Sequence, residues 1–173
     1  MILPAVGAQD AAQPTPPPAV VQIVVNPPVV TVGETVTVSA NLLNFGNLYG
    51  LQVSCAVDAG LLAGLGRADG DVFNASNSFF VDEGLKPDGK WLIAATRLQP
   101  APPFAGNGVA FSFQYRAQAA GSSSVSCSAL ASDPFSIMLP LEVQGAGSIT
   151  VNPVAVVETV VPLPTALPTV ELP

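Results

Sequence analysis

Acidic side chains in two turns are the first candidates for chemistry in this sequence. Asp69 and Asp71 form one pair, and Asp82, Glu83 and Asp88 form a second group. Paired carboxyl groups carry out general acid–base catalysis on glycosides, and carboxylate oxygens also bind calcium. Both groups lie beside Gly residues, where Asp is favoured because its side chain hydrogen-bonds the local backbone. We therefore favour a turn role for these residues. A weak calcium site is the alternative, and catalysis comes last.

Other catalytic chemistry lacks its side chains. The 173-residue chain contains no His, the commonest general base and the commonest metal ligand. A serine nucleophile would then need a Lys base, and neither Lys86 nor Lys90 stands in a Ser-x-x-Lys context. The net charge is −7, from five Lys and Arg against twelve Asp and Glu, and no cationic cluster is present to bind phosphates. The sequence therefore predicts a protein that is not an enzyme and does not bind nucleic acid.

Trp91, the only tryptophan, is the best candidate for a ligand contact. It suggests an aromatic platform on which a sugar ring could stack, together with Tyr49, Tyr115 and the pair Phe79 and Phe80. Tyr115, however, alternates in phase with Phe111 and is expected in the core. For Trp91 itself, a core or rim position is the favoured interpretation and a ligand contact the alternative.

Two cysteines, Cys55 and Cys127, are too few for a disulfide-rich scaffold or a zinc site. An even pair in a secreted chain predicts one bridge, and two separate buried thiols are the alternative. Each cysteine falls on the apolar phase of an alternating segment, so a bridge requires that the two segments be neighbours or face each other. Residues 6–8 (VGA) resemble the end of an export signal. We therefore expect a secreted protein, extracellular or on the cell surface.

Short alternating segments must position all these residues, because no segment shows a sustained helical period. The clearest alternation predicts that Val109, Phe111, Phe113 and Tyr115 point inward. Nine short segments with polar turns between them predict two packed sheets, an all-β sandwich. The expected strands are residues 21–25, 35–42, 51–57, 78–81, 90–98, 109–116, 123–130, 139–143 and 148–151.

The chain divides into one domain and two irregular ends. Residues 20–152 carry the strand signals and form the expected domain. Residues 1–19 are interpreted as an export-signal remnant followed by a Pro-rich linker, and residues 153–173 as a second Pro-rich linker or tail, because repeated prolines favour extended chain. No apolar run reaches the roughly 18 to 20 residues that a membrane-spanning helix needs.

Four motifs in this order and spacing resemble those of bacterial cohesin domains. They are residues 32–38 (VGETVTV), 47–53 (NLYGLQV), 106–113 (GNGVAFSF) and 145–151 (GAGSITV). The resemblance covers residues 21–151 and implies a nine-stranded jelly-roll β-sandwich.

The resemblance also implies a function and a site. Cohesins bind a dockerin module of a partner protein, usually an enzyme or a surface component, through one flat sheet face. By position, that face would include Gln52, Ser54 and Ala56 on one strand and the strands around Phe80 and Trp91.

Three hypotheses follow. The leading one is a secreted, non-catalytic binding module that docks a dockerin-type protein partner in an extracellular or cell-surface assembly, without a cofactor unless calcium binds. The second is a self-assembling filament or surface-layer subunit whose Pro-rich ends pack into neighbouring copies. The third is a carbohydrate-binding module, for which Trp91 is the main residue.

Overall fold

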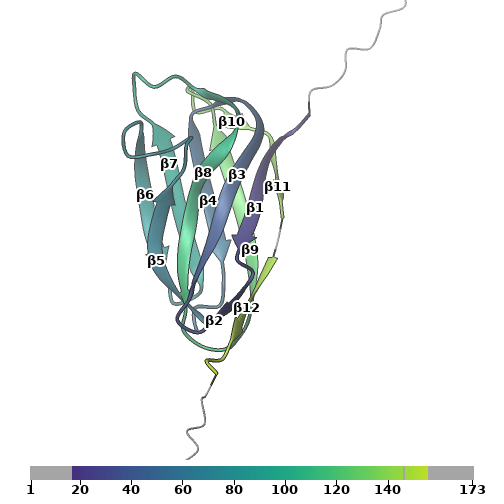
Figure 1. Cartoon of the computed structure of the whole chain (residues 1–173). Helices are drawn as coiled ribbons and strands as arrows, with labels where there is room; N and C mark the ends of the chain where they lie inside the picture. Colours follow the sequence, from purple (N-terminus) through teal and green to yellow (C-terminus); the bar gives the residue numbers. More distant parts are fainter. Residues whose placement is uncertain (1–16, 146, 156–173) are drawn as a thin grey trace, which may run out of the picture.

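Two β-sheets packed face to face make up the computed structural model, which describes residues 17–145 and 147–155 (Figure 1). The first sheet has five strands in the order β11 (Leu141–Gln144), β1 (Ala19–Asn26), β3 (Thr35–Leu48), β8 (Phe104–Ala117) and β5 (Leu62–Asp69). The second has seven, in the order β2 (Val29–Thr31), β12 (Gly147–Asn152), β9 (Gly121–Ser132), β4 (Gly50–Ala56), β7 (Lys90–Arg97) and β6 (Ser78–Leu85), with β10 (Met138–Leu139) paired to β9. The predicted linkers therefore lie largely outside the described residues.

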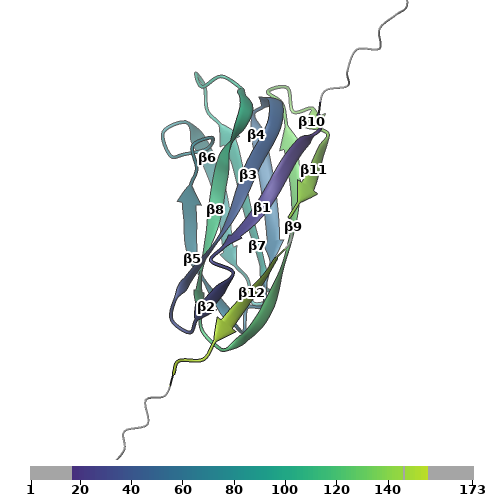
Figure 2. The same cartoon turned by 45° about the vertical axis from the view of Figure 1, so that its right-hand side comes forward.

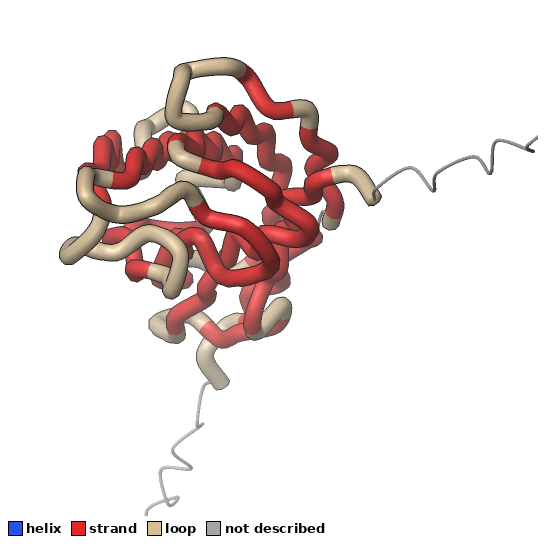
Figure 3. The backbone as a smooth tube through the Cα atoms, turned by 90° about the horizontal axis from the view of Figure 1, so that it is seen from above, coloured by secondary structure: helices blue, strands red, loops and turns tan. Residues whose placement is uncertain are grey.

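The predicted all-β sandwich is confirmed, and Figure 3 shows strands and loops but no helix in the described part of the chain. It follows that no described segment is an apolar helix long enough to cross a membrane. Nine of the twelve strands have six residues or more. The three shorter ones, β2, β10 and β11, pair at the margins of the sheets.

Three parts of the strand pattern differ from the sequence prediction. The three-residue strand β2, which follows Pro27 and Pro28, was not expected. β5 was not expected, because Gly64 and Gly66 interrupt its alternation and a bulge lies between them. The segment expected at residues 139–143 is divided at Pro140. Leu139 pairs with Ala131 of β9, whereas Leu141 pairs with Ala19 of β1. Pro140 has no N–H to donate, so the chain leaves one sheet there and joins the other.

The core lies between the sheets and is lined by alternating residues of both. Phe111, Phe113 and Tyr115 of β8 are fully buried, as predicted. Val109 is instead 37% exposed, so the prediction that it points inward is wrong. Ala40 pairs with Phe111 and Asn41 with Val109, which leaves one extra residue on β8 and reverses the phase of the strand at that bulge.

The predicted disulfide is confirmed. Cys55 of β4 and Cys127 of β9 lie directly opposite each other in the strand pair, with their Cα atoms 4.1 Å apart and an S–S distance of 2.10 Å. The bridge therefore joins two neighbouring strands of the seven-stranded sheet and does not connect the two sheets.

The two ends of the domain lie at opposite ends of the sandwich. β1 begins at the upper end in Figure 1, and β12 finishes at the lower end, as the rotated view confirms (Figure 2). We call these ends the entry pole and the exit pole.

Candidate binding face

The outer surface of the seven-stranded sheet is the candidate site. Strand pairing sets the neighbours across it: Val81 of β6 lies opposite Ala94 of β7, Ala94 opposite Gln52 of β4, and Gln52 opposite Leu130 of β9. A second row lies beside the first, two residues closer to the start of β4. It contains Phe79, Thr96, Gly50, Ser132 and Met138, from β6, β7, β4, β9 and β10. We call the outward side of β6, β7, β4, β9 and β10 the binding face.

Large apolar side chains stand out from this face. Phe79, Val81, Leu130 and Met138 are between 46% and 58% exposed. Beside them, towards the exit pole, β4 and β9 present small hydroxyl side chains at Ser54, Ser126 and Ser128. The face therefore combines an apolar region with a region of hydroxyl groups.

Charge is confined to one end of the binding face. Among its described outward residues, only Glu83 and Lys90 are charged. Glu83 forms an ion pair with Lys86, and Lys90 lies 3.8 Å from Asp88. The central rows carry none, although the whole chain has a net charge of −7.

A shallow hollow of about 250 Å³ lies where the two rows meet. Its lining includes Gly50 and Gln52 of β4, Ala94 of β7, Leu130 of β9 and Met138 of β10. A Cβ atom at Gly50 would lie only 2.7 Å from Ser132 Oγ, so a larger residue at this position would fill the hollow and displace that hydroxyl. Because Gly50 has no side chain, the hollow at the centre of the face stays open.

The structure places Gln52, Ser54 and Ala56 on the outward side of β4, while Val53 and Cys55 between them are fully buried. This is the orientation that the alternation predicts. Their contribution to binding stays a prediction.

Trp91 does not lie on the binding face. The favoured interpretation of a core position is confirmed, and the place on the partner-binding face that the resemblance implied for it is wrong. Its side chain is 1% exposed and meets Phe113 and Tyr115 edge to face, with ring centroids 5.5 and 5.2 Å apart. The indole Nε1 donates a hydrogen bond to Asp82 Oδ1 at 2.6 Å. Trp91 is thus a core residue that connects the two sheets.

Phe80 is also turned inward, so its predicted place on the outward surface is wrong as well. Its ring lies edge to face with Phe111, at a centroid distance of 6.4 Å. The guanidinium of Arg67 covers it from the solvent side, 3.5 Å from the ring centroid. The neighbouring Phe79 and Val81 point outward in its place.

The sequence did not show that Phe79 and Val81 point outward, because β6 begins with apolar residues on both of its sides. Residues 79–81 are Phe, Phe and Val, so alternation cannot distinguish the inner side of the strand from the outer. Their partners on β7 do not separate the two sides either, because Phe80 pairs with Ala95 and Val81 with Ala94.

The carboxylate groups bind neighbouring backbone. Asp82 Oδ1 accepts from Gly84 N at 3.0 Å as well as from Trp91, Asp88 Oδ1 accepts from Lys90 N at 3.1 Å, and Asp71 Oδ1 from Val109 N at 2.5 Å. The contacts of Asp82 and Asp88 with backbone two residues away are those expected of residues that fix turns, whereas Asp71 ties its loop to β8. In the described ranges, no three His, Cys, Asp or Glu side chains are grouped to hold a metal ion.

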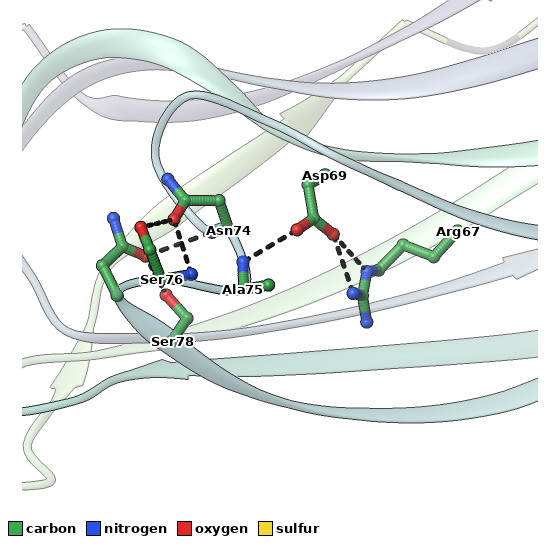
Figure 4. Close-up of polar contacts among 7 residues, drawn as sticks. Arg67, Asp69, Asn74, Ala75, Ser76 and Ser78 are labelled. Carbon is green, nitrogen blue, oxygen red and sulfur yellow. Dashed lines mark hydrogen bonds and ion pairs between the residues drawn. The ribbon is translucent and has the colours of Figure 1, made fainter.

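Asp69, the other member of the first acidic pair, orders the loop between β5 and β6 (Figure 4). It forms an ion pair with Arg67 at 2.7 Å and accepts from Ala75 N at 2.8 Å. In the same loop, Asn74 Oδ1 accepts from both the backbone N and the Oγ of Ser76, at 3.0 and 2.5 Å. Each polar side chain labelled in the figure therefore makes at least one local hydrogen bond or ion pair.

Comparison with known proteins identifies the fold. Neither a protein-family model nor a curated protein sequence matches this chain. Among solved structures, a type II cohesin domain from the cellulosome of Acetivibrio cellulolyticus is similar at 18% identity and a TM-score of 0.65, covering 77% of this chain and 95% of that one. A non-cellulosomal cohesin from the archaeon Archaeoglobus fulgidus is similar at 11% identity and a TM-score of 0.63, covering 79% and 92%.

A type I cohesin–dockerin complex from Clostridium thermocellum is similar at 14% identity and a TM-score of 0.63, covering 82% of this chain and 98% of that one. The described residues thus have the fold of cohesin domains, and the resemblance found in the sequence is confirmed at the level of the fold.

Proposed function

We propose that this chain is a non-catalytic binding module that docks a dockerin-type module of another protein on its binding face. The cohesin fold supports the proposal, since several similar structures were solved as cohesin–dockerin complexes. The observation that carries it in this chain is the uncharged, partly apolar centre of the face, where Leu130 and Met138 line the hollow and the exposed Phe79 and Val81 stand on β6, beyond β7.

The other broad face makes a useful contrast. The outer side of the five-stranded sheet presents mainly hydroxyl and amide groups, among them Thr37, Asn41 and Gln114. Ser39 Oγ and Ser112 Oγ hydrogen-bond to each other there at 2.9 Å. Contiguous exposed apolar surface on a soluble domain marks an interaction site. Only the binding face offers such surface across neighbouring strands of the described sheets.

The chemistry of the face indicates what a partner must present. Its exposed large side chains are apolar anchors around a depression, the arrangement in which a few contacts supply most of the binding energy. A partner helix or loop with apolar residues at its centre fits this surface, whereas a partner that relies on a charged cluster would find no counter-charge at the centre.

Two other hypotheses gain less support. The carbohydrate-binding hypothesis depended on Trp91, whose side chain is buried between the sheets. Catalysis would need carboxylates free to react, and those of Asp71, Asp82 and Asp88 accept backbone hydrogen bonds.

We also propose that the module acts outside the cell. The Cys55–Cys127 disulfide supports this placement, because such bonds persist in oxidising compartments and are rare in the cytosol.

Calorimetric titration with purified type I and type II dockerin modules tests the docking proposal. We expect one dockerin class to bind, and Leu130→Asp to weaken that binding at least tenfold by placing a charge in the apolar region. Leu65→Asp is the matched control, because Leu65 is equally exposed, 53% against 54%, and lies on β5 of the other sheet. Absence of binding to both dockerin classes, or an equal effect of the two substitutions, would refute docking through this face.

A further inference from the structure

An apolar groove opens at the entry pole and shares no lining residue with the hollow of the binding face. It has a volume of about 530 Å³. Three segments line it: the residues that lead into β1, the end of β3, and the crossing from β10 to β11. The apolar contributors are Pro17, Pro18, Phe45, Leu139, Pro140 and Leu141. We call it the entry groove.

The groove exists because β3 continues past the start of β1. Val20 of β1 pairs with Leu43, and β1 begins only one residue earlier, at Ala19. Pro17 and Pro18 have no N–H groups and so cannot extend the ladder along β3. Asn44, held at a φ of 59°, donates its side-chain Nδ2 to Pro18 O at 3.3 Å instead.

The last part of β3 is therefore paired on one side only. Phe45 pairs with Gly106 and Leu48 with Phe104, both on β8. On the β1 side, the described residues offer this segment no strand partner, and that side faces the groove. The groove thus combines apolar side chains with a short stretch of unpaired strand edge.

An ordered apolar turn leads into the groove. Phe135 and Ile137 are 80% and 62% exposed and precede the groove segment at Leu139. The turn is fixed by Asp133, whose Oδ1 accepts from the backbone N of Phe135 at 2.8 Å and of Ile137 at 2.9 Å. A turn built in this way presents its apolar side chains in fixed positions, which lowers the entropic cost of covering them.

The sequence of this chain contains a segment of matching chemistry. Residues 156–173 have two charged side chains, Glu158 and Glu171, and otherwise only Val, Leu, Ala, Thr and Pro. Prolines at positions 162, 164 and 168 favour an extended conformation of the kind that apolar grooves bind. Among the described residues that line the groove, Glu142 alone is charged, so apolar contact must supply the attraction.

The position of the two ends favours a second copy as the source of that segment. β12 finishes at the exit pole, at the far end of the sandwich from the groove (Figures 1 and 2). The fourteen residues of β3 span about 46 Å at about 3.3 Å per residue, so the chain's own segment would have to run back along the whole domain. We propose that the entry groove binds residues 156–173 of a second copy, which joins copies head to tail.

Gly46 provides a variant that blocks the groove without disturbing the fold. It lines the groove, and a Cβ atom added there meets no atom within 4 Å. We therefore expect the side chain of Gly46→Gln to enter the groove without a clash. Ala120→Gln is the matched control, because Ala120 is exposed in the turn between β8 and β9 at the exit pole.

Sedimentation equilibrium of the full chain, from 10 µM to 1 mM as the working range, tests the proposal. We expect the average mass to rise above the monomer value of 17.5 kDa with concentration, and association to weaken at least tenfold in Gly46→Gln but not in Ala120→Gln. A synthetic peptide of residues 156–173 should reverse the association, and the same peptide with Leu163→Asp and Leu167→Asp should not.

Three results would overturn it. A mass that stays at 17.5 kDa over the whole range excludes a second copy as the occupant, whether or not the peptide binds. Equal association of the two glutamine variants locates self-association elsewhere. If Leu130→Asp abolishes association and Gly46→Gln leaves it intact, copies associate through the binding face and not through the entry groove.

Discussion

Tyr115 carries a polar group that the core does not use. The side chain is fully buried, and its hydroxyl has no hydrogen-bond partner among the described residues. An unpaired buried hydroxyl contributes nothing to offset the loss of its contacts with water. We expect Tyr115→Phe to leave the free energy of unfolding at pH 7 unchanged or to raise it by up to about 1 kcal/mol. Urea denaturation measures this, and a loss above about 1 kcal/mol would show that the hydroxyl has a partner.

The same residue predicts a loss of stability in alkali. Burial raises the pKa of the Tyr115 hydroxyl above its ordinary value near 10, so above that pH the unfolded chain releases a proton that the folded chain keeps. Below about pH 10 the hydroxyl is protonated in both states and does not lower the free energy of unfolding. Above that pH, each further pH unit lowers the free energy of unfolding by up to about 1.4 kcal/mol. Unfolding of wild type and Tyr115→Phe between pH 9 and 11.5 should show a shallower decline in the variant. Parallel declines would contradict this role.

Asp82 anchors the indole of Trp91 at the margin of the core. It accepts the Nε1–H of Trp91 at 2.6 Å, and without it that donor would be left unpaired in a nearly buried position. We expect Asp82→Ala to cost about 1–3 kcal/mol and Asp82→Asn, which keeps an acceptor oxygen, clearly less. Denaturation monitored by the fluorescence of the single tryptophan tests this. Equal losses in both variants would mean that the charge, and not the acceptor, is what matters.

Residue orientation was predictable where one side of a strand is polar. Gln52 and Ser54 alternate with Val53 and Cys55, so the outward side of β4 could be predicted from the sequence. In β7, residues 91–95 are all apolar, and the sequence contains no signal for which side is inward. Only the register, with Trp91 opposite Cys55 and Ile93 opposite Val53, shows that Trp91 belongs to the core.

At the scale of elements, β5 shows why a strand can escape detection. A Cβ atom at Gly64 would lie 2.9 Å from Leu85 Cβ and 3.0 Å from Trp91 Cζ3, so glycine is required for β5 to approach the other sheet. The residue that permits this contact also interrupts the alternation that identifies a strand. The bulge in β8 had a similar effect on Val109, because the sequence does not indicate where an extra residue enters the ladder.

The β4–β9 pair is held by both a strand ladder and a disulfide. The bridge connects residues 72 positions apart, and in the chain-entropy model closing a loop of that length stabilises the folded state by roughly 4 kcal/mol. We expect the double variant Cys55→Ser and Cys127→Ser to unfold at a clearly lower denaturant concentration. Reductant should lower the midpoint of the wild type and leave that of the variant unchanged. A wild type that does not respond to complete reduction would contradict this contribution.

At the scale of the whole molecule, the charged side chains lie outside the central rows of the binding face. The chain has a net charge of −7, while the central rows of the binding face have none. Added salt screens charged contacts and leaves apolar ones largely intact. We expect the affinity for a dockerin to change less than about threefold between 50 and 500 mM NaCl, as measured by calorimetry. A tenfold loss would mean that charged residues at the rim dominate binding.

The disulfide also determines how the domain would respond to tension. Load applied through its two ends enters at β1 and leaves at β12, at opposite poles of the sandwich (Figure 1). The bridge between Cys55 and Cys127 lies between these points in the sequence and closes a loop with a separation of 72 residues. At about 3.5 Å per residue, it withholds roughly 250 Å of contour length from any extension. A tether built from this module would lengthen only by its outer segments, and the strands that carry the binding face would stay linked at their centre.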